Sequence, residues 1–448
     1  MMLSGTKLFA GILLFLLSVQ SAVAQRGDIQ YFRPYDRNGV NVFETSKNDS
    51  LPFDGLKLRL GANFTQGFQA LSHSNSSGVP LYNLGNGFPL AQANMNIDVQ
   101  VADGVRVGLV SYMSSHHHNE FWVKGGYVQV DKVNFLKMPF LDKLWTNLTL
   151  KVGHMEINYG DAHFRRSDGG NTLWNPFMEN NIIDAFTTEI GGELYWQKKG
   201  FILMGGLTNG EIQGSVEGSG NRGPSLYGKA GFDKFITTNT RVRLTGSFLT
   251  KSSSLNATLF SGDRTGSNYQ YAMEPATATL SGNAFGGRVN PGFTDNLTTF
   301  VLNPFVKLSN LELFGTVEFA EGSSAVENGE KTFNATTSFI NKQPNRRFSQ
   351  FAGDALYRFG GNRQFYVGAR YNLVNAQLAF WNASKPEAVR TVRNVSIDRA
   401  AFAAGWFMTP NVLLKGEYVI QNYKNYPDES ILAGGNFNGF VFQGSIGF

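Results

Sequence analysis

The sequence contains no cysteine, which excludes disulfide bonds, a thiolate nucleophile, an iron–sulfur cluster and a lipoprotein anchor. Charged residues are also scarce: they make up 16% of the 448 residues and leave a formal net charge of +5. The basic residues are dispersed along the chain, so the charge gives no support to nucleic acid as a partner.

Long apolar runs are missing as well. After the first 24 residues, no stretch approaches the roughly 20 consecutive apolar residues that a transmembrane helix needs. Yet aromatic residues reach 13%, with 38 phenylalanines, while the mean hydropathy is only −0.20. A protein wall that is apolar on one face and hydrated on the other reconciles these values.

The N-terminus has the features of a secretory signal peptide. Lys7 precedes the apolar run "LFAGILLFLLSV", and small residues lead to a cleavage site at Ala24. We therefore expect a signal peptide at 1–24, a periplasmic or lumenal lead-in at 25–54, and one β-barrel domain at 55–448.

Most of the remaining chain alternates apolar and polar residues with a period of two, in segments typical of tilted transmembrane strands. Sixteen such segments are predicted: 55–64, 92–101, one beginning at Val105, 120–131, 147–159, 186–197, 201–209, 225–235, 240–250, 297–308, 311–320, 347–359, 363–375, 394–408, 411–422 and 437–448. In the 147–159 segment the apolar phase shifts, which predicts a bulge beside Gly153. The connection 133–146 predicts a short amphipathic helix.

Short turns alternate with long polar loops, which are predicted at 71–89, 160–185, 251–296, 321–346 and 376–393. This rhythm predicts an all-β fold: a transmembrane antiparallel β-barrel of sixteen strands with both termini in the periplasm. The register of the predicted strand 240–250 follows from its two faces. Val242, Leu244 and Phe248 lie on one face, and Arg241 and Arg243 lie on the other. A slip by one residue would place both guanidinium groups in lipid at about 2–4 kcal/mol each.

The chain ends on "FVFQGSIGF", an alternating strand with a terminal aromatic residue, Phe448. Because lipid offers the backbone no hydrogen bonds, we expect this last strand to pair with the first and close the sheet. The predicted aromatic girdle consists of Phe448, Tyr159, Trp196, Trp406 and Tyr418.

Together, the signal peptide, the sixteen segments, the turn rhythm and the C-terminal segment resemble Gram-negative outer-membrane porins. The lead-in "DIQYFRPYDRNGVNVFETSK" is similar to porin-like proteins of the Bacteroidota, and the phosphate-selective porins are distantly similar, although no arginine run matches their anion ladder. The resemblance implies passive diffusion of small hydrophilic solutes across the cell outer membrane, contact with its lipids, assembly by the barrel-assembly machinery, and a homotrimer.

The resemblance also implies that the loop from Gly160 to Phe186, which corresponds to the third extracellular loop of porins, folds inward and narrows the pore. That loop carries the opposed charges Asp161, Arg165, Arg166, Asp168 and Glu179. Two alternatives stay open: a solvated surface loop whose charges pair locally, and a lumen plugged by the loop 251–296.

Strand parity places further charged residues in the lumen. The basic candidates are Lys57, Arg59, Arg106, Lys229, Arg241, Arg243, Arg370 and Lys415, and the acidic candidates are Asp98, Glu189, Glu193, Asp233, Glu312, Glu318 and Glu417. Because the two sets nearly balance, we expect at most a weak preference for anions.

Enzymatic activity, cofactors and metal ions are not expected. The G-x-G-x-x-G match at Gly218 to Gly223 leads into a strand and not a helix, His116 to His118 are typical of a solvated loop, and no G-x-S-x-G elbow accompanies His154. A second hypothesis remains: an accessory or structural barrel whose long loops bind envelope or secretion partners. A lumen filled by the lead-in or by the loop 251–296 would support this second hypothesis.

Overall fold

Sixteen strands form the wall of the molecule, as the alternating segments predict. The computed structural model describes residues 29–47, 51–114, 121–210, 223–252, 257–261, 266–283, 285–324, 327, 344–381 and 390–448. The strands are β1 (Lys57–Ser74), β2 (Gln92–Ala102), β3 (Val105–Met113), β4 (Trp122–Val130), β5 (Leu148–Glu156), β6 (Thr188–Lys198), β7 (Phe201–Thr208), β8 (Ser225–Thr237), β9 (Thr240–Lys251), β10 (Asn296–Leu308), β11 (Leu311–Ser323), β12 (Arg346–Phe359), β13 (Phe365–Trp381), β14 (Arg390–Thr409), β15 (Val412–Lys424) and β16 (Asn436–Gly447).

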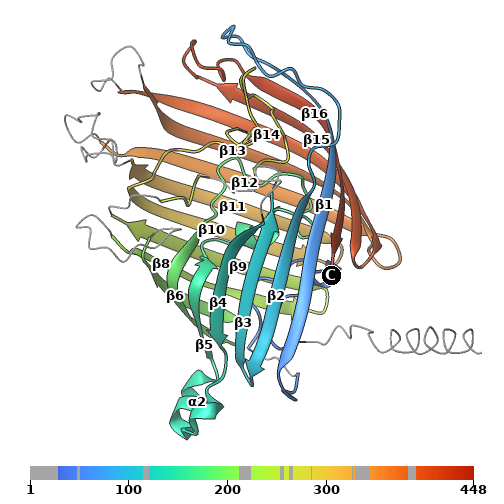
Figure 1. Cartoon of the computed structure of the whole chain (residues 1–448), viewed down its shortest axis with the longest axis vertical. Coiled ribbons are helices and arrows are strands. Elements are labelled where there is room, and N and C mark those ends of the chain that lie inside the picture. Colours follow the sequence, from blue (N-terminus) through green and yellow to red (C-terminus); the bar gives the residue numbers. More distant parts are fainter. Residues whose placement is uncertain are drawn as a thin grey trace, which may run out of the picture.

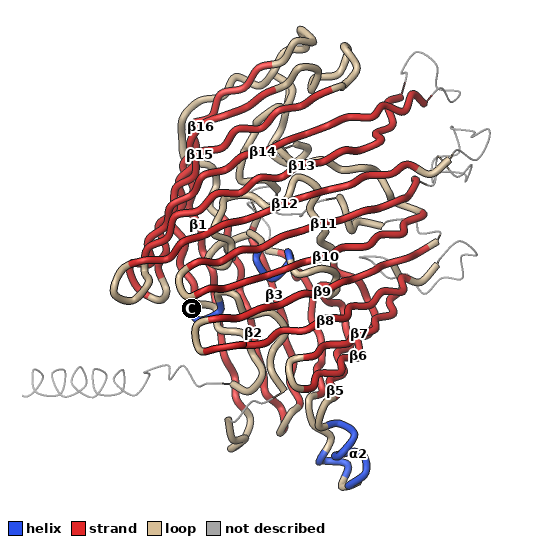
Figure 2. Tube along the Cα trace, turned by 180° about the vertical axis from the view of Figure 1, so that it is seen from behind, coloured by secondary structure: helices blue, strands red, loops and turns tan. Residues whose placement is uncertain are grey.

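Every strand pairs antiparallel with its neighbours in the chain, and β16 returns to pair with β1, so the sheet is a closed barrel (Figures 1 and 2). The closing register runs from Asn63 opposite Gly447 to Ser74 opposite Asn436. Beyond the last ladder residue, Phe448 and Ala62 exchange backbone hydrogen bonds of 3.0 and 2.9 Å. The predicted pairing of the last strand with the first is confirmed.

The two faces of the wall differ in polarity. On β9, Leu244 and Phe248 are 36% and 47% exposed on the outer face, whereas Arg243 is 1% exposed and points into the barrel. Trp196 and Trp406 lie on the outer face, as predicted. The register argued from Arg241 and Arg243 is therefore confirmed.

Several strands are longer than predicted, and the largest extensions are those of β1, β13 and β14. β1 continues to Ser74 and takes up only the start of the loop predicted at 71–89, whereas β13 and β14 reach Trp381 and Arg390, so more than half of the loop predicted at 376–393 is strand. The added residues differ between the strands: β1 gains polar residues such as Ser72 opposite Asn438, whereas β13 gains apolar residues such as Leu378 and Ala379 on successive positions. Residues of one kind on both faces hide the alternation, although the backbone ladder continues.

The predicted bulge beside Gly153 is wrong, because β5 pairs without a register shift with both β4 and β6. The apolar phase changes for another reason: after the strand, Ile157 and Tyr159 enter a buried cluster inside the barrel. Tyr159 is 3% exposed, and its Oη lies 3.1 Å from the Glu318 carboxylate. Its predicted place in the lipid-facing girdle is therefore also wrong.

Among the described residues, helical structure is limited to short pieces. These are the 3-10 turns η1 (Arg37–Gly39), η2 (Asn134–Leu136) and η3 (Ala162–Arg165) and the α-helix α2 (Pro139–Trp145), which confirms the helix predicted in the connection 133–146. In the part of the chain that the structure describes, no helix has the length and apolar character of a membrane-crossing helix.

Some predictions fall on residues outside those described. They are the signal peptide at 1–24, His116 to His118, and all of the G-x-G-x-x-G match except Gly223.

Tyrosine rings on the inner wall lie over glycines of neighbouring strands. A Cβ atom added to Gly405 would lie 2.1 Å from the ring of Tyr366, which is buried and donates a hydrogen bond of 2.9 Å from its Oη to Pro176 O. Because this hydrogen bond restrains the ring, Tyr366 cannot easily move to make room for a Cβ atom at position 405.

We predict that Gly405→Ala lowers the free energy of unfolding by about 1–3 kcal/mol, the usual cost of overpacking. Urea unfolding of the protein in lipid vesicles, followed by tryptophan fluorescence, measures the change. The control is Gly353→Ala on β12, where an added Cβ meets nothing within 4 Å. Equal free energies for the two variants would contradict this account.

Candidate functional site in the barrel lumen

The inner wall carries the charged residues that strand parity predicted. The deeply buried members are Arg106, Lys229, Arg243, Arg370, Lys415, Asp98, Glu189, Glu193, Glu312, Glu318 and Glu417. Arg59, Arg241 and Asp233 are largely buried and paired, Arg59 with Asp98 at 2.6 Å and Arg241 with Asp233 at 2.6 Å. Lys57, at the start of β1, pairs instead with the exposed Asp54 at 2.9 Å.

Segments from three parts of the chain lie inside the wall and contact these charges: the lead-in at 29–47, the β5–β6 loop at 157–187, and the described parts of the β9–β10 loop. Ile183, Tyr269 and Phe293, from the two loops, belong to one buried apolar cluster together with wall residues such as Val374. Both loops that sequence analysis offered as alternatives for the lumen therefore occupy it, and the lead-in occupies it as well.

Asp161 and Glu44 both form ion pairs with the wall cations Arg243 and Lys229. Asp161, from the β5–β6 loop, lies 2.7 Å from Arg243 Nε and 3.0 Å from Lys229 Nζ. Glu44, from the lead-in, lies 2.8 Å from Arg243 Nη2 and 3.2 Å from Lys229 Nζ. Two wall cations thus hold a loop and the lead-in together.

The pKa values of these two carboxyl groups follow from that arrangement. Burial alone would raise the pKa of Glu44, but Arg243 and Lys229 outweigh it and lower the pKa to about 2. The same two cations outweigh burial at Asp161 and hold its pKa far below the ordinary value. Both groups therefore remain ionised at neutral pH.

The two arginines of the β5–β6 loop lie in different surroundings. Arg165 donates a hydrogen bond to Asn41 Oδ1 of the lead-in and stands 3.9 Å from Asp354. Arg166 pairs with Asp184 at 2.5 Å and lies 3.8 Å from Asp168, which also binds Lys124 of β4.

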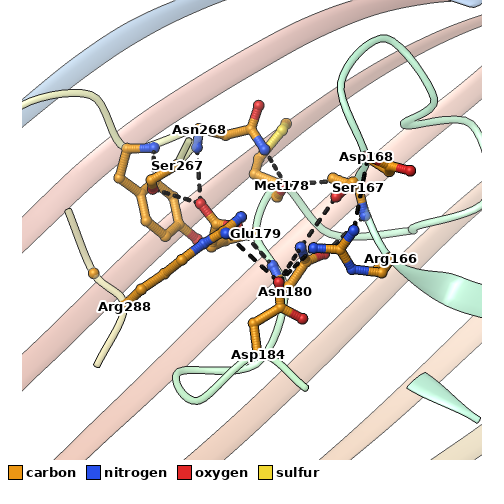
Figure 3. Close-up of polar contacts among 12 residues, drawn as sticks. Arg166, Ser167, Asp168, Met178, Glu179, Asn180, Asp184, Ser267, Asn268 and Arg288 are labelled. Carbon is orange, nitrogen blue, oxygen red and sulfur yellow. Dashed lines mark hydrogen bonds and ion pairs between the residues drawn. The ribbon is translucent and has the colours of Figure 1, made fainter. Parts of the chain in front are cut away.

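Glu179 joins the two lumenal loops, as Figure 3 shows. Its carboxylate accepts hydrogen bonds from Ser267 Oγ at 2.5 Å, Asn268 N at 2.8 Å and Arg288 Nη2 at 2.8 Å, all in the β9–β10 loop. Its backbone carbonyl accepts a hydrogen bond of 2.8 Å from Arg370 on β13. The pKa of Glu179 is lowered because Arg288 and Arg399 outweigh the effect of burial.

The far wall holds the β5–β6 loop mainly by its backbone. Lys415 on β15 donates three hydrogen bonds of 2.9 to 3.0 Å to the carbonyls of Thr172, Asn175 and Phe177. Asn372 and Gln350 accept from Ile182 N and Ile183 N at 2.7 and 2.9 Å. The loop therefore crosses the lumen from β5 to the wall formed by β12, β13 and β15.

Among the five predicted loop charges, the structure brings Arg166 and Asp168 together and separates the others. Asp161 pairs with the wall, Arg165 faces the lead-in and β12, and Glu179 faces the second loop. Sequence reasoning missed Glu44 and Arg288. The lead-in did carry a signal, since its aromatic residues and arginines are unusual for a solvated linker.

A cavity of about 280 Å³ lies beside the lead-in, against the inner faces of β3 to β6. The lining residues are Phe32, Arg33, Tyr35, Phe43, Glu44, Thr45, Arg106, Tyr127, Gln129, Thr149, Lys151, Glu156, Asn158, His163, Phe164, Arg166, Asp168, Asn171, Trp174, Tyr195 and Gln197. Most of its charges already face an opposite charge, for example Arg106 with Asp131 at 3.3 Å and Glu156 with His163 at 2.7 Å. The charges that line the cavity therefore largely compensate one another.

Among the described residues, no group of three or more histidine, aspartate or glutamate side chains is arranged to hold a metal ion. His154 bonds to Thr188 Oγ1 at 3.0 Å.

No protein-family model and no curated protein matches the chain. Solved structures do match. An anion-selective porin from Comamonas acidovorans has a TM-score of 0.51 at 11% identity, over 88% of this chain and 100% of that chain. The outer-membrane channel DcaP of Acinetobacter baumannii gives 0.47 at 8% identity, over 88% and 98%. The trimer form of OmpT, an outer membrane protein of Vibrio cholerae, gives 0.46 at 11% identity, over 88% and 100%. The chain therefore shares the barrel fold of the Comamonas porin.

We predict that Glu44→Gln loosens the lead-in, because removing one member of a buried charged cluster leaves Arg243 and Lys229 less compensated. Hydrogen–deuterium exchange of peptides from 29–47 at pH 7 should show at least a tenfold loss of protection, which corresponds to about 1.4 kcal/mol. The control is Glu321→Gln, which removes an exposed ion pair with Arg347.

The same contact makes docking of the lead-in pH-dependent. The pKa of Glu44 is depressed from 4.5 to about 2. The ionised carboxylate therefore stabilises the docked lead-in fully above pH 4.5, and this stabilisation is lost as the pH falls towards 2. Unchanged protection in Glu44→Gln would contradict the role given to this carboxylate.

Proposed function

We propose that the protein is an outer-membrane porin through which small hydrophilic solutes or ions diffuse passively. One observation carries the proposal: a closed barrel presents apolar side chains outward and charged, hydrogen-bonding side chains inward. Barrels of about this strand number enclose an aqueous channel whose selectivity depends on lumen residues and inserted loops. The shared fold with an anion-selective porin supports the proposal.

In this proposal the β5–β6 loop and the lead-in form the constriction, and the residues Asp161, Arg165, Arg166, Asp168 and Glu179 hold it in place more than they attract ions. Since these charges are paired, we propose at most a weak preference for anions. We further propose that the protein catalyses no covalent step, has the lipids of the outer membrane around it, depends on the barrel-assembly machinery and forms a homotrimer.

The accessory barrel remains the second candidate, and a specific observation favours it. Tyr269 of the β9–β10 loop and Glu44 of the lead-in both reach wall residues inside the barrel, so both segments take up part of the lumen, which supports this candidate.

Conductance in planar bilayers separates the two candidates. We expect stepwise conductance from the full mature chain, and a reversal potential close to zero in a potassium chloride gradient. A variant without residues 30–46 should give larger steps, because the lead-in no longer takes up lumen cross-section. If neither the wild type nor this variant conducts, the porin proposal fails and the accessory barrel is favoured. A strongly cation-selective reversal potential would contradict the proposed weak preference for anions.

A further inference from the structure

The connection between β4 and β5 differs from the other turns at its end of the barrel. Most turns at this end are short, for example the one between Lys198 and Phe201, whereas residues 131–147 extend outward and include η2 and α2. Figure 1 shows α2 beyond the end of β5, away from the rest of the barrel.

Large apolar side chains cover this connection. Phe140 is 69% exposed and Leu144 is 55% exposed, and the other exposed members are Phe135, Leu136 and Met138. None of these five side chains belongs to the buried apolar clusters inside the barrel. An exposed apolar patch of this kind in a stable protein marks a surface that contacts something apolar.

Basic residues accompany the apolar ones. The stretch 133–146 contains Lys137 and Lys143 and one acidic residue, Asp142, so its net charge is +1, and Lys132 directly precedes it. Lys132 pairs with Asp103 at 2.8 Å, and Lys137 and Lys143 are exposed. Apolar side chains with lysines beside them are typical of segments that lie in the headgroup region of an anionic bilayer.

The apolar surface also continues onto the barrel wall. On strands adjoining this connection, Val152 of β5 and Trp196 of β6 are exposed on the outer face, and Trp196 pairs directly with Leu148, close to the end of α2. Tryptophan at such a position is typical of the boundary between lipid and water. The apolar patch on 133–146 is therefore continuous with the apolar outer surface of the barrel wall.

The dimensions also fit this location. A seven-residue helix is roughly 10 Å long. The polar layer on each side of the hydrocarbon is roughly 5–7 Å thick, and a short helix lying flat places its apolar face at the boundary.

We propose that residues 133–146 form an interfacial anchor that binds the headgroup region of an anionic phospholipid bilayer at the short-turn end of the barrel. Phe140 and Leu144 enter the acyl boundary, and Lys137 and Lys143 bind lipid phosphates. The inference rests on the proposed membrane location of the barrel.

The absence of cysteine makes a direct test simple, because each introduced cysteine is a unique labelling site. The full mature chain carries an environment-sensitive nitrobenzoxadiazole label at Phe140→Cys, in vesicles of phosphatidylethanolamine and phosphatidylglycerol containing nitroxide-labelled lipid. We expect blue-shifted emission and at least a twofold loss of intensity caused by the nitroxide lipid.

Two control positions make the outcomes distinct. Leu203→Cys, on the outward face of β7, reports whether the wall itself lies in lipid. Gly361→Cys reports an ordinary turn, and its new side chain has open space around it. Quenching at position 203 without quenching at 140 overturns the anchor alone. No quenching at 203 overturns the membrane location and the anchor together.

A separate measurement tests whether Lys137 and Lys143 bind anionic lipid. In the double variant Lys137→Asn with Lys143→Gln, the preference of the label at 140 for phosphatidylglycerol over phosphatidylcholine vesicles should disappear. An unchanged preference, or a label at 140 that is shielded only in chemically cross-linked dimers, would overturn the proposal in favour of another contact, such as a second copy of this chain.

Discussion

The whole structure depends on one constraint: within lipid, every backbone N–H and C=O group must find its partner in the protein. The antiparallel ladder meets this demand along the sheet, and the pairing of β1 with β16 removes the two edges that would otherwise remain. Once the sheet is closed, alternation sends every second side chain into an enclosed space. The polarity of that space then has to be compensated locally.

The lumen shows how this compensation is made. A buried charge without a partner is costly, and a pair of buried charges is tolerated when further hydrogen bonds complete it. Arg243 and Lys229 on the wall are met by Asp161 of a loop and Glu44 of the lead-in, and Glu179 is met by Arg288 of another loop. Side chains of the inner wall therefore also position the segments that lie inside the barrel.

The sequence predicts the strands well because lipid enforces a strict period on them. The register around Arg243 and the pairing of Phe448 follow directly from that rule. It applies only inside the hydrocarbon layer, so it does not predict the extensions of β1, β13 and β14 or the burial of Tyr159 inside the barrel. Contacts such as Glu44 with Arg243 join residues about two hundred positions apart, and no local pattern encodes them.

A disulfide cross-link tests closure most directly. Phe68 on β1 and Phe442 on β16 lie opposite each other, and the chain has no other cysteine to interfere once both are replaced. In the double variant Phe68→Cys with Phe442→Cys, mild oxidation in vesicles should produce an intramolecular disulfide, detected by faster migration in denaturing gels. The pair Phe68→Cys with Phe351→Cys, on strands that are not neighbours, should not cross-link. Failure of the first pair to form, or its formation only between chains, would contradict the closed barrel.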